Sequence, residues 1–190
     1  MTQGLQVIPR VQRQCDAFIS AFKARHSAEN AALITVHVRA GDYVQLGAAP
    51  PADFFQRAVA ELVRARRKGR QHVCVLMVSN SHLWLRQNLL SQAQTATHGC
   101  AEIVGAYKRA KDTAIWGTNS TDALDMCVVS RGDDIVIGGG SYGFFGAFLS
   151  RTAATVTYTT RQFLFGDAWH RPTEYYPPWW NGDAHTDLRV

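Results

Sequence analysis

The chain has 190 residues, 46% of them hydrophobic, which suits one globular domain with a substantial core. Lys and Arg outnumber Asp and Glu by 20 to 15, a net charge of +5. The one basic run, residues 64–70 (RARRKGR), is typical of the solvated end of a helix, and the other basic residues are scattered. We therefore expect no nucleic-acid partner. The positive excess suits a phosphate-bearing small molecule.

The cysteines and the hydropathy pattern exclude further classes of protein. None of the four cysteines forms a CxxC pair, which argues against a structural zinc site. Cys74 lies in the apolar run HVCVLMV and Cys127 in a helical pattern, so both are expected to be small buried hydrophobic residues. No apolar segment approaches the roughly 18 residues of a membrane span. No secretory signal precedes the first predicted helix, so we expect a soluble chain or one whose targeting region lies outside this sequence.

Apolar runs alternate with helical periodicity along the chain. Residues 10–25 carry apolar side chains at helical spacing and predict an amphipathic helix. The β-branched run LITVHV (33–38) predicts a buried strand, and Pro50 and Pro51 open the next helix. The same patterns then predict strands at 72–79, 101–105, 133–140 and 153–159, and helices around 83–90, 121–130 and 142–150.

This alternation predicts the fold class. Strands that are apolar on both faces and separated by helices are typical of a parallel sheet covered on two sides. We therefore predict an α/β fold, a Rossmann-like parallel sheet with helices on both faces. Ligands of such sheets bind at the carboxyl ends of the strands. His37, Arg39, Gly41 and Asp42 occupy that end of the first predicted strand, in ITVHVRAGDYV.

A second chemistry-bearing stretch, DDIVIGGGSYGFFGAFLS, runs from a predicted strand into a predicted helix. Its glycines allow the backbone to approach a ligand, and a helix start offers free N–H groups and a positive dipole end. The stretch is neither GxGxxG nor a P-loop, and a tight turn without a ligand explains it equally well. Arg39 favours a diphosphate cradle, because a planar guanidinium suits a phosphate held at two points.

Together these stretches resemble a known enzyme family. HVRAGDY resembles the HxRRxDY motif of the α-1,2-fucosyltransferases, glycosyltransferase family 11, and GGGSYGFFGAFL is similar to the second motif of that family. LDMCVVSRGDDIVI and VSNSHLW are similar to further family segments, so the resemblance spans residues 31–165. The spacing from Asp125 to Ser141 also resembles the core α-1,6-fucosyltransferases.

The resemblance implies a fold, a reaction and a set of site residues. The fold would be the C-terminal, donor-binding half of a GT-B glycosyltransferase. The reaction would transfer fucose from GDP-fucose to the 2-hydroxyl of a terminal galactoside, with inversion and with no required metal or other cofactor. Arg39 matches the arginine that holds the β-phosphate of GDP, and Ser141 matches a hydroxyl that binds the pyrophosphate. The remaining donor-binding positions are Gly140 and Tyr142, beside Ser141, and His37 and Asp125, near the guanine and ribose.

Several of these residues also have an ordinary structural explanation. Asp42 is the local candidate for the base that accepts the proton of the acceptor hydroxyl, but an Asp at a strand-to-loop junction is as often an acceptor for backbone N–H groups. His37 alone would be a satisfied core histidine, and Asp125 a polar residue on a helix. Helix packing, rather than sugar stacking, is expected for Phe144, Phe145 and Phe148.

The sequence departs from the family pattern in two respects. The second arginine of the motif is Ala40 here, and its absence is expected to weaken donor binding by on the order of 1–3 kcal/mol, the scale of a lost charged hydrogen bond. The acceptor half of the family is largely absent before residue 31, so we expect a fragment or a reduced form. Residues 1–30 are then a remnant or linker helix, 31–165 a GDP-fucose-binding domain and 166–190 an aromatic tail.

The tail and a sequon leave alternatives open. EYYPPWW (174–180) reads as an acceptor-binding aromatic patch, a cover for the core or half of a buried interface, so homo-oligomerisation stays open. Asn119 begins the sequon NST, which matters only in the secretory pathway, and a helix N-cap at residues 119–121 is the alternative. The resemblance implies the Golgi lumen, and we expect that the membrane anchor typical of animal members is not part of this sequence.

Two functional hypotheses of different classes follow. The first is a working α-1,2-fucosyltransferase whose partners are GDP-fucose and a galactoside-terminated glycan. The second is a non-catalytic GDP-sugar-binding domain. Both predict GDP binding, and only the first predicts transfer. A third idea, a phosphate-binding enzyme related to the α/β-hydrolases, lacks the G-x-S-x-G elbow, because the serine of GGSYG follows two glycines.

Overall fold

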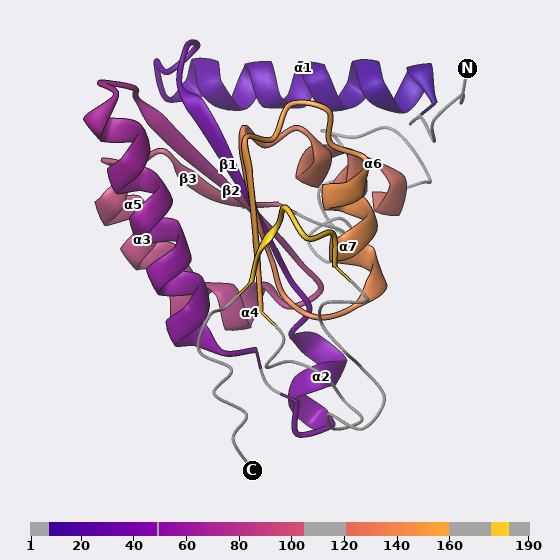
Figure 1. Cartoon of the computed structure of the whole chain (residues 1–190). Helices are drawn as coiled ribbons and strands as arrows, with labels where there is room; N and C mark the ends of the chain where they lie inside the picture. The colour runs from indigo at the N-terminus through magenta and orange to yellow at the C-terminus, as the bar shows by residue number, and fades with distance from the viewer. Residues whose placement is uncertain (1–7, 49, 105–120, 160–175, 183–190) are drawn as a thin grey trace.

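The computed structural model describes residues 8–48, 50–104, 121–159 and 176–182. Within them the chain forms a six-stranded, all-parallel sheet with the strand order β3-β2-β1-β4-β5-β6 (Figure 1). The predicted α/β, Rossmann-like fold is therefore confirmed. The strands are β1 (Ala32–Val38), β2 (Val73–Ser79), β3 (Ala101–Val104), β4 (Asp134–Ile137), β5 (Thr155–Tyr158) and β6 (Asn181–Gly182).

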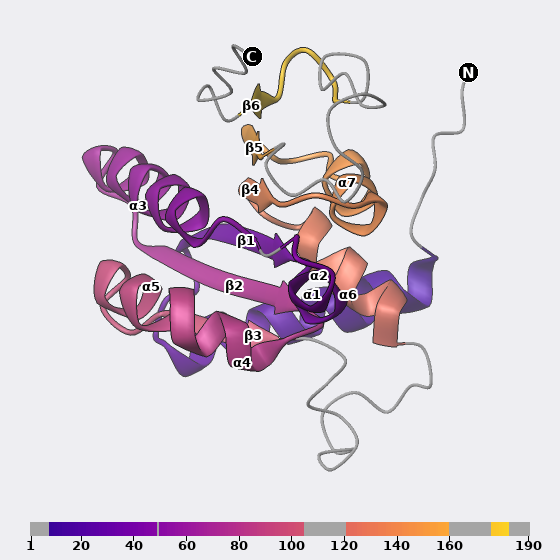
Figure 2. The same cartoon turned by 90° about the horizontal axis from the view of Figure 1, so that it is seen from below.

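Helices flank the sheet in two groups. Helices α3, α4 and α5 cover one face, and α1, α6 and α7 cover the other, as the two views show (Figures 1 and 2). The short helix α2 lies beyond the carboxyl end of β1 (Figure 1). The helices are α1 (Pro9–Arg25), α2 (Gly41–Gln45), α3 (Ala52–Lys68), α4 (His82–Leu85), the π-helical turn η1 (Arg86–Leu90), α5 (Ser91–Ala96), α6 (Thr121–Ser130) and α7 (Ser141–Phe148).

The side chains of β1 alternate between the two faces of the sheet. Ile34 and Val36 pack in the core beneath α3, whereas Leu33 packs in the core beneath α1 and α6. Because a strand repeats every two residues, His37 points to the same face as Leu33. Its ring accordingly contacts the ring of Tyr142 in α7. The alternation of β1 thus directs a histidine towards the helix that follows β4.

Two aromatic side chains of the segment that leads into β6 pack on the same face of the sheet as α1 and α7. Tyr176 and Trp180 are buried, and both rings contact Phe144 of α7. Phe22 of α1 is fully buried in the same core cluster. Of the alternatives for the aromatic segment, a cover for the core therefore describes Tyr176 and Trp180, whereas Trp179 is 77% exposed.

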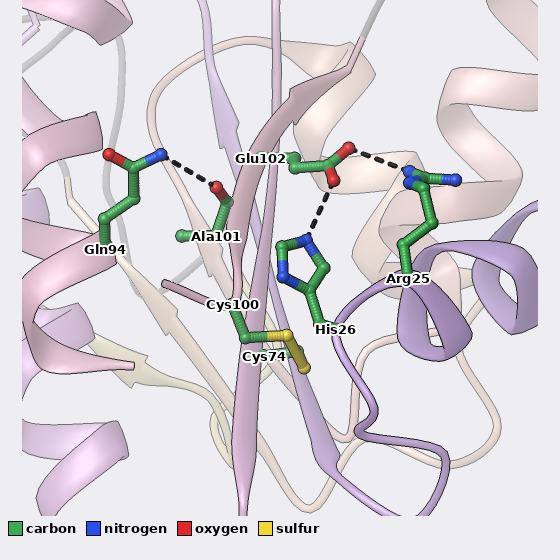
Figure 3. Close-up of polar contacts among 7 residues, drawn as sticks. All are labelled: Arg25, His26, Cys74, Gln94, Cys100, Ala101 and Glu102. Atoms are coloured by element: carbon green, nitrogen blue, oxygen red, sulfur yellow. Dashed lines mark hydrogen bonds and ion pairs between the residues drawn. A yellow bond between two sulfur atoms is a disulfide. The ribbon is translucent and has the colours of Figure 1, made fainter. Parts of the chain in front are cut away.

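Cys74 and Cys100 form a disulfide (Figure 3). The expectation that Cys74 is simply a small hydrophobic residue was therefore wrong, although the side chain is buried. The pairing follows from strand register, because Val75 lies opposite Ala101 and each cysteine immediately precedes one of them. Register depends on tertiary structure, so the sequence pattern did not reveal it. The thiol of Cys127 is buried and free, as expected.

Polar contacts also hold the edge strand β3 (Figure 3). Glu102 of β3 pairs with Arg25, and the Nε2 atom of His26 lies 2.9 Å from the other carboxylate oxygen. On the opposite side, Gln94 of α5 donates a hydrogen bond to the carbonyl of Ala101. The end of α1 and the end of α5 are thereby tied to the same strand.

Helix α3 ends within the basic run at residues 64–70. Most of this run is exposed, as expected of a helix end, but Arg66 turns inwards. Its Nε donates to the buried carboxylate of Asp134 at 2.7 Å, and its Nη2 donates to the carbonyl of Asp133. Arg66 therefore connects the end of α3 to the start of β4.

Among the helices that the structure describes, none combines the length and the apolar character needed to cross a bilayer. The sequon at Asn119 falls outside the described residues.

Candidate active site

The candidate site lies where the strand order reverses. From β1 the chain continues to β2 and β3 on one side, and then returns to β4, β5 and β6 on the other. In open α/β sheets, ligands bind at the carboxyl ends of the strands at such a switch point. Arg39 follows β1 directly, and Ser141 begins α7 shortly after β4. The topology therefore places one of the two sequence-predicted stretches on each side of the switch point.

His37 is a buried neutral imidazole in the wall of the site. Its side chain is only 5% exposed, and its ring centroid lies 5.1 Å from that of Tyr142. Burial, together with the nearby charge of Arg39, lowers the pKa of His37 to about 4. The Nδ1 atom has no hydrogen-bond partner among the described residues. The imidazole is therefore uncharged at neutral pH, and one of its ring nitrogens lacks a hydrogen-bond partner among the described residues.

Arg39 and Asp42 form a two-pronged ion pair. Arg39 Nε donates to Asp42 Oδ1 at 2.9 Å, and Arg39 Nη2 donates to Oδ2 at 2.7 Å. The side chains are 41% and 45% exposed. This hydrogen bonding lowers the pKa of Asp42 and raises that of Arg39, so the pair stays ionised through the physiological range. The guanidinium also lies over the ring of Tyr43, 5.7 Å from its centroid. The result is an oriented cation that solvent can reach.

Asn80 joins this ion pair to the neighbouring strand β2. Its Oδ1 accepts hydrogen bonds from the backbone N–H groups of Ala40 and Gly41, both at 3.0 Å. Its Nδ2 donates to Asp42 Oδ1 at 2.9 Å. In the sequence, VSNSHLW resembles a family segment but gives Asn80 no individual role. The sequence signal that could have identified Asn80 is its position, as a polar residue directly after the buried strand predicted at 72–79.

The segment directly after β1 has two features that bear on the site. The residues after the strand form helix α2 rather than a loop. Ala40, which stands in place of the second arginine, is fully buried and packs in the core beneath α3. The methyl group of Ala40 therefore lies in the protein interior.

The start of α7 forms the other side of the site. Gly140 has a φ of +99°, a left-handed conformation that favours glycine, and Ser141 behind it is exposed. The hydroxyl of Tyr142 donates to the backbone carbonyl of Asp122 in α6. At Gly143, an added Cβ would lie 2.7 Å from His37 Nδ1, so glycine allows the helix to approach the strand. The first N–H groups of an α-helix have no partner within it, which makes this end suitable for anions.

A cavity of about 170 Å³ connects several of these residues. It is smaller than the roughly 300–1,000 Å³ of a complete small-molecule site, and it has room for part of a nucleotide. Asp125, which is buried in α6, contributes to its wall; Asp42, Gly140 and Ser141 do not line it. Its polar lining comes from His37, Arg39, Ser79, Asn80, Asp122, Asp125 and Tyr142.

A larger cavity, of about 420 Å³, lies at the opposite edge of the sheet, where the strands begin. Its lining includes Arg67, Arg70, His72 and His98. These side chains stand at or just after helix ends, where basic groups complement the helix dipoles. We assign the site to the switch point, because only that edge gathers the two predicted motifs.

Among the described residues, no three His, Cys, Asp or Glu side chains are grouped as a metal site.

Comparison with known proteins identifies the family. The model of the family described as "Glycosyl transferase family 11" matches residues 6–183. Neither the curated proteins nor the solved structures contained a match to the chain. The family match covers nearly the whole sequence, including both motifs at the switch point. The chain therefore belongs to glycosyl transferase family 11, and this membership implies a glycosyltransferase with fucosyltransferase activity in general.

Proposed function

We propose that the chain transfers L-fucose from GDP-fucose to the 2-hydroxyl of a terminal β-galactoside, with inversion at the anomeric carbon and without a metal. Family membership supports the fucosyl transfer. The observation that carries the choice of donor is Arg39. It is a half-exposed guanidinium, held in a fixed orientation by Asp42 at the topological switch point.

Arg39 and the start of α7 would together stabilise the leaving group. When the fucosyl bond breaks, negative charge builds on the β-phosphate of GDP. A preorganised cation and oriented N–H dipoles stabilise such charge without having to reorganise. Arg39 supplies the cation, and Gly140 and Ser141 precede and begin the helix that supplies the dipoles. The fucose carbon meanwhile gains oxocarbenium character, as in glycoside hydrolysis.

The cavity beside Arg39 would receive the nucleoside of the donor. Its wall contains the uncharged His37, the buried Asp125 and Tyr142. A carboxylate suits the hydroxyl groups of a ribose, and a neutral imidazole suits a base edge, because it donates from one nitrogen and accepts at the other. The proposal therefore gives His37 and Asp125 the places near the guanine and ribose that the family resemblance implies.

Asp42 is assigned to orienting Arg39 rather than to accepting a proton. Both of its carboxylate oxygens accept hydrogen bonds from Arg39, and one also accepts from Asn80. These contacts lower the pKa of Asp42 and make it a weak base. A general base works best with a pKa near the working pH. Its contribution to catalysis would then come through the guanidinium.

The compartment and the acceptor belong to the same proposal. The Cys74–Cys100 disulfide favours an oxidising compartment, and the Golgi lumen is one in which galactoside-terminated glycans are present. The second candidate function is a non-catalytic GDP-sugar-binding domain. The observation that favours it is Ala40, which stands where the family motif has its second arginine, so the chain lacks that cation.

The test combines donor binding with transfer. GDP and GDP-fucose are titrated calorimetrically into the wild type and into Arg39→Ala, and each sample is then assayed for transfer to lactose. Arg57→Ala is the matched control, because Arg57 forms an exposed pair with Asp53 on α3. Transfer that Arg39→Ala removes and Arg57→Ala keeps supports the proposal. Binding without transfer favours the non-catalytic alternative, and donor binding that survives Arg39→Ala contradicts the assigned site.

A further inference from the structure

We propose that Asn80 is a positioning residue, which holds Asp42 and, through Asp42, aligns the guanidinium of Arg39 with the β-phosphate of the donor. The inference rests on the proposed function and deepens it. It gives a role to Asn80, the residue that directly follows β2, beyond its place in the cavity wall.

The backbone at the start of α2 depends on Asn80. Helix α2 begins after Ala40, whose side chain has no group that can cap a helix. Asn80 supplies the missing acceptor from the neighbouring strand, because its Oδ1 accepts from the N–H groups of Ala40 and Gly41. The segment that carries Arg39 and Asp42 is therefore fastened to the end of β2, whose strand is buried along its whole length.

The same amide reaches the ion pair. Asn80 Nδ2 donates to Asp42 Oδ1, the oxygen that also accepts from Arg39 Nε. An exposed ion pair between residues three apart is weakly held by itself. The bond from Asn80 gives the carboxylate a fixed third contact, so the plane of the guanidinium is set by the sheet rather than by solvent.

An amide is the group that this position requires. It presents an acceptor oxygen and a donor nitrogen on one planar unit, and here each faces its complement. In Asn80→Asp, one oxygen still accepts from the two backbone N–H groups. The other would replace Nδ2, which lies 2.9 Å from Asp42 Oδ1, so two carboxylates would face each other. This variant therefore separates the loop anchor from the contact with Asp42.

The first experiment measures GDP and GMP affinities by calorimetry in the wild type, Asn80→Ala, Asn80→Asp and Arg39→Ala. GMP lacks the β-phosphate, so the ratio of GDP affinity to GMP affinity reports on the contact between Arg39 and that phosphate. We expect both Asn80 variants to lower the ratio of GDP affinity to GMP affinity by about tenfold, the scale of a misaligned charged hydrogen bond. Asn88→Ala is the matched control, since this half-buried amide bonds only the carbonyl of Trp84 among the described residues.

The second experiment asks whether Asn80 acts through Asp42. Asp42→Ala and the double variant Asp42→Ala/Asn80→Ala complete a double-mutant cycle on GDP affinity. If Asn80 acts through Asp42, the double variant loses no more than the worse single variant. Losses that multiply to about a hundredfold would show independent action and overturn the inference.

The outcomes separate this inference from the proposed function. If the wild type does not bind GDP, or if Arg39→Ala leaves the GDP-to-GMP ratio unchanged, the proposed function fails and this inference fails with it. If Arg39→Ala lowers the ratio while both Asn80 variants keep it, only the inference is overturned. An equal loss of GDP and GMP affinity would show a merely structural role. Asn80→Asp decides the matter if Asn80→Ala does not fold.

Discussion

Gly143 lies directly against His37. A Cβ at position 143 would lie 2.7 Å from His37 Nδ1, which is closer than a carbon atom tolerates next to a ring nitrogen, whereas its 3.4 Å distance from Cβ of Ile137 is an ordinary contact. The absence of a side chain at Gly143 therefore determines how near α7 packs to β1. The start of α7 and the end of β1 form the two sides of the proposed donor site, so this contact controls the spacing between them.

Gly143→Ala should destabilise the fold by about 1–3 kcal/mol and weaken GDP binding, because the added methyl group pushes α7 away from His37. Urea unfolding and calorimetry measure the two effects. The control is the same substitution in a His37→Ala background, where the ring that causes the clash is gone. A penalty of the same size in both backgrounds would contradict the explanation.

The buried imidazole of His37 predicts a dependence of stability on pH. Its pKa is about 4 in the folded chain, whereas an unperturbed histidine has a pKa of 6.5, so the unfolded chain binds more protons between these values. Stability is therefore fully present above pH 6.5 and is lost as the pH falls towards 4. Between pH 7 and pH 5, this group alone should remove about 2 kcal/mol.

Urea unfolding of the wild type and of His37→Gln at the two pH values isolates this contribution. The other histidines titrate in both proteins, so only the difference between the two pH dependences belongs to His37. We expect the wild type to lose about 2 kcal/mol more than the variant. An equal loss would mean that His37 is not held uncharged in the folded chain.

Reducing the Cys74–Cys100 disulfide should lower the free energy of unfolding by about 3 kcal/mol. The bond closes a loop between residues 26 apart, and cross-linking restricts the unfolded chain to that extent. Unfolding with and without a phosphine reductant measures the change. Cys74→Ala/Cys100→Ala should not respond to the reductant, since Cys15 and Cys127 are already free thiols. A wild type that ignores the reductant would rule out the bond.

Arg66→Ala should destabilise the chain by about 3 kcal/mol, because it leaves a buried carboxylate unpaired. The side chain of Asp134 is only 3% exposed, and Arg66 lies 2.7 Å from it. Thermal or urea unfolding measures the loss. Arg57→Ala breaks an exposed pair with Asp53 and should change stability by less than about 1 kcal/mol. If the two variants lose equally, Arg66 has no special role in joining α3 to β4.

The sequence by itself determined the elements of the central fold. The uninterrupted apolar runs at β1 and β2 predicted strands buried on both faces, and the structure buries every residue of both strands. The prolines at positions 50 and 51 predicted where the next helix opens, and α3 begins at Ala52. These properties follow from local periodicity and composition, which can be read without knowing which segments meet. The carboxyl-end position of Arg39 followed from the same periodicity, because the polar cluster comes directly after a buried run.

Only the tertiary structure decided which distant residues meet. The disulfide depends on the register of β2 against β3, and the contacts of Asn80 depend on β2 lying beside β1. Helix α2 was not predicted, because its start is capped by that residue from another strand rather than by a neighbour in the sequence. The burial of Ala40 and the short strand β6 likewise depend on what packs against them. Local periodicity carries no record of such pairings, since each is fixed by the order and register of the strands.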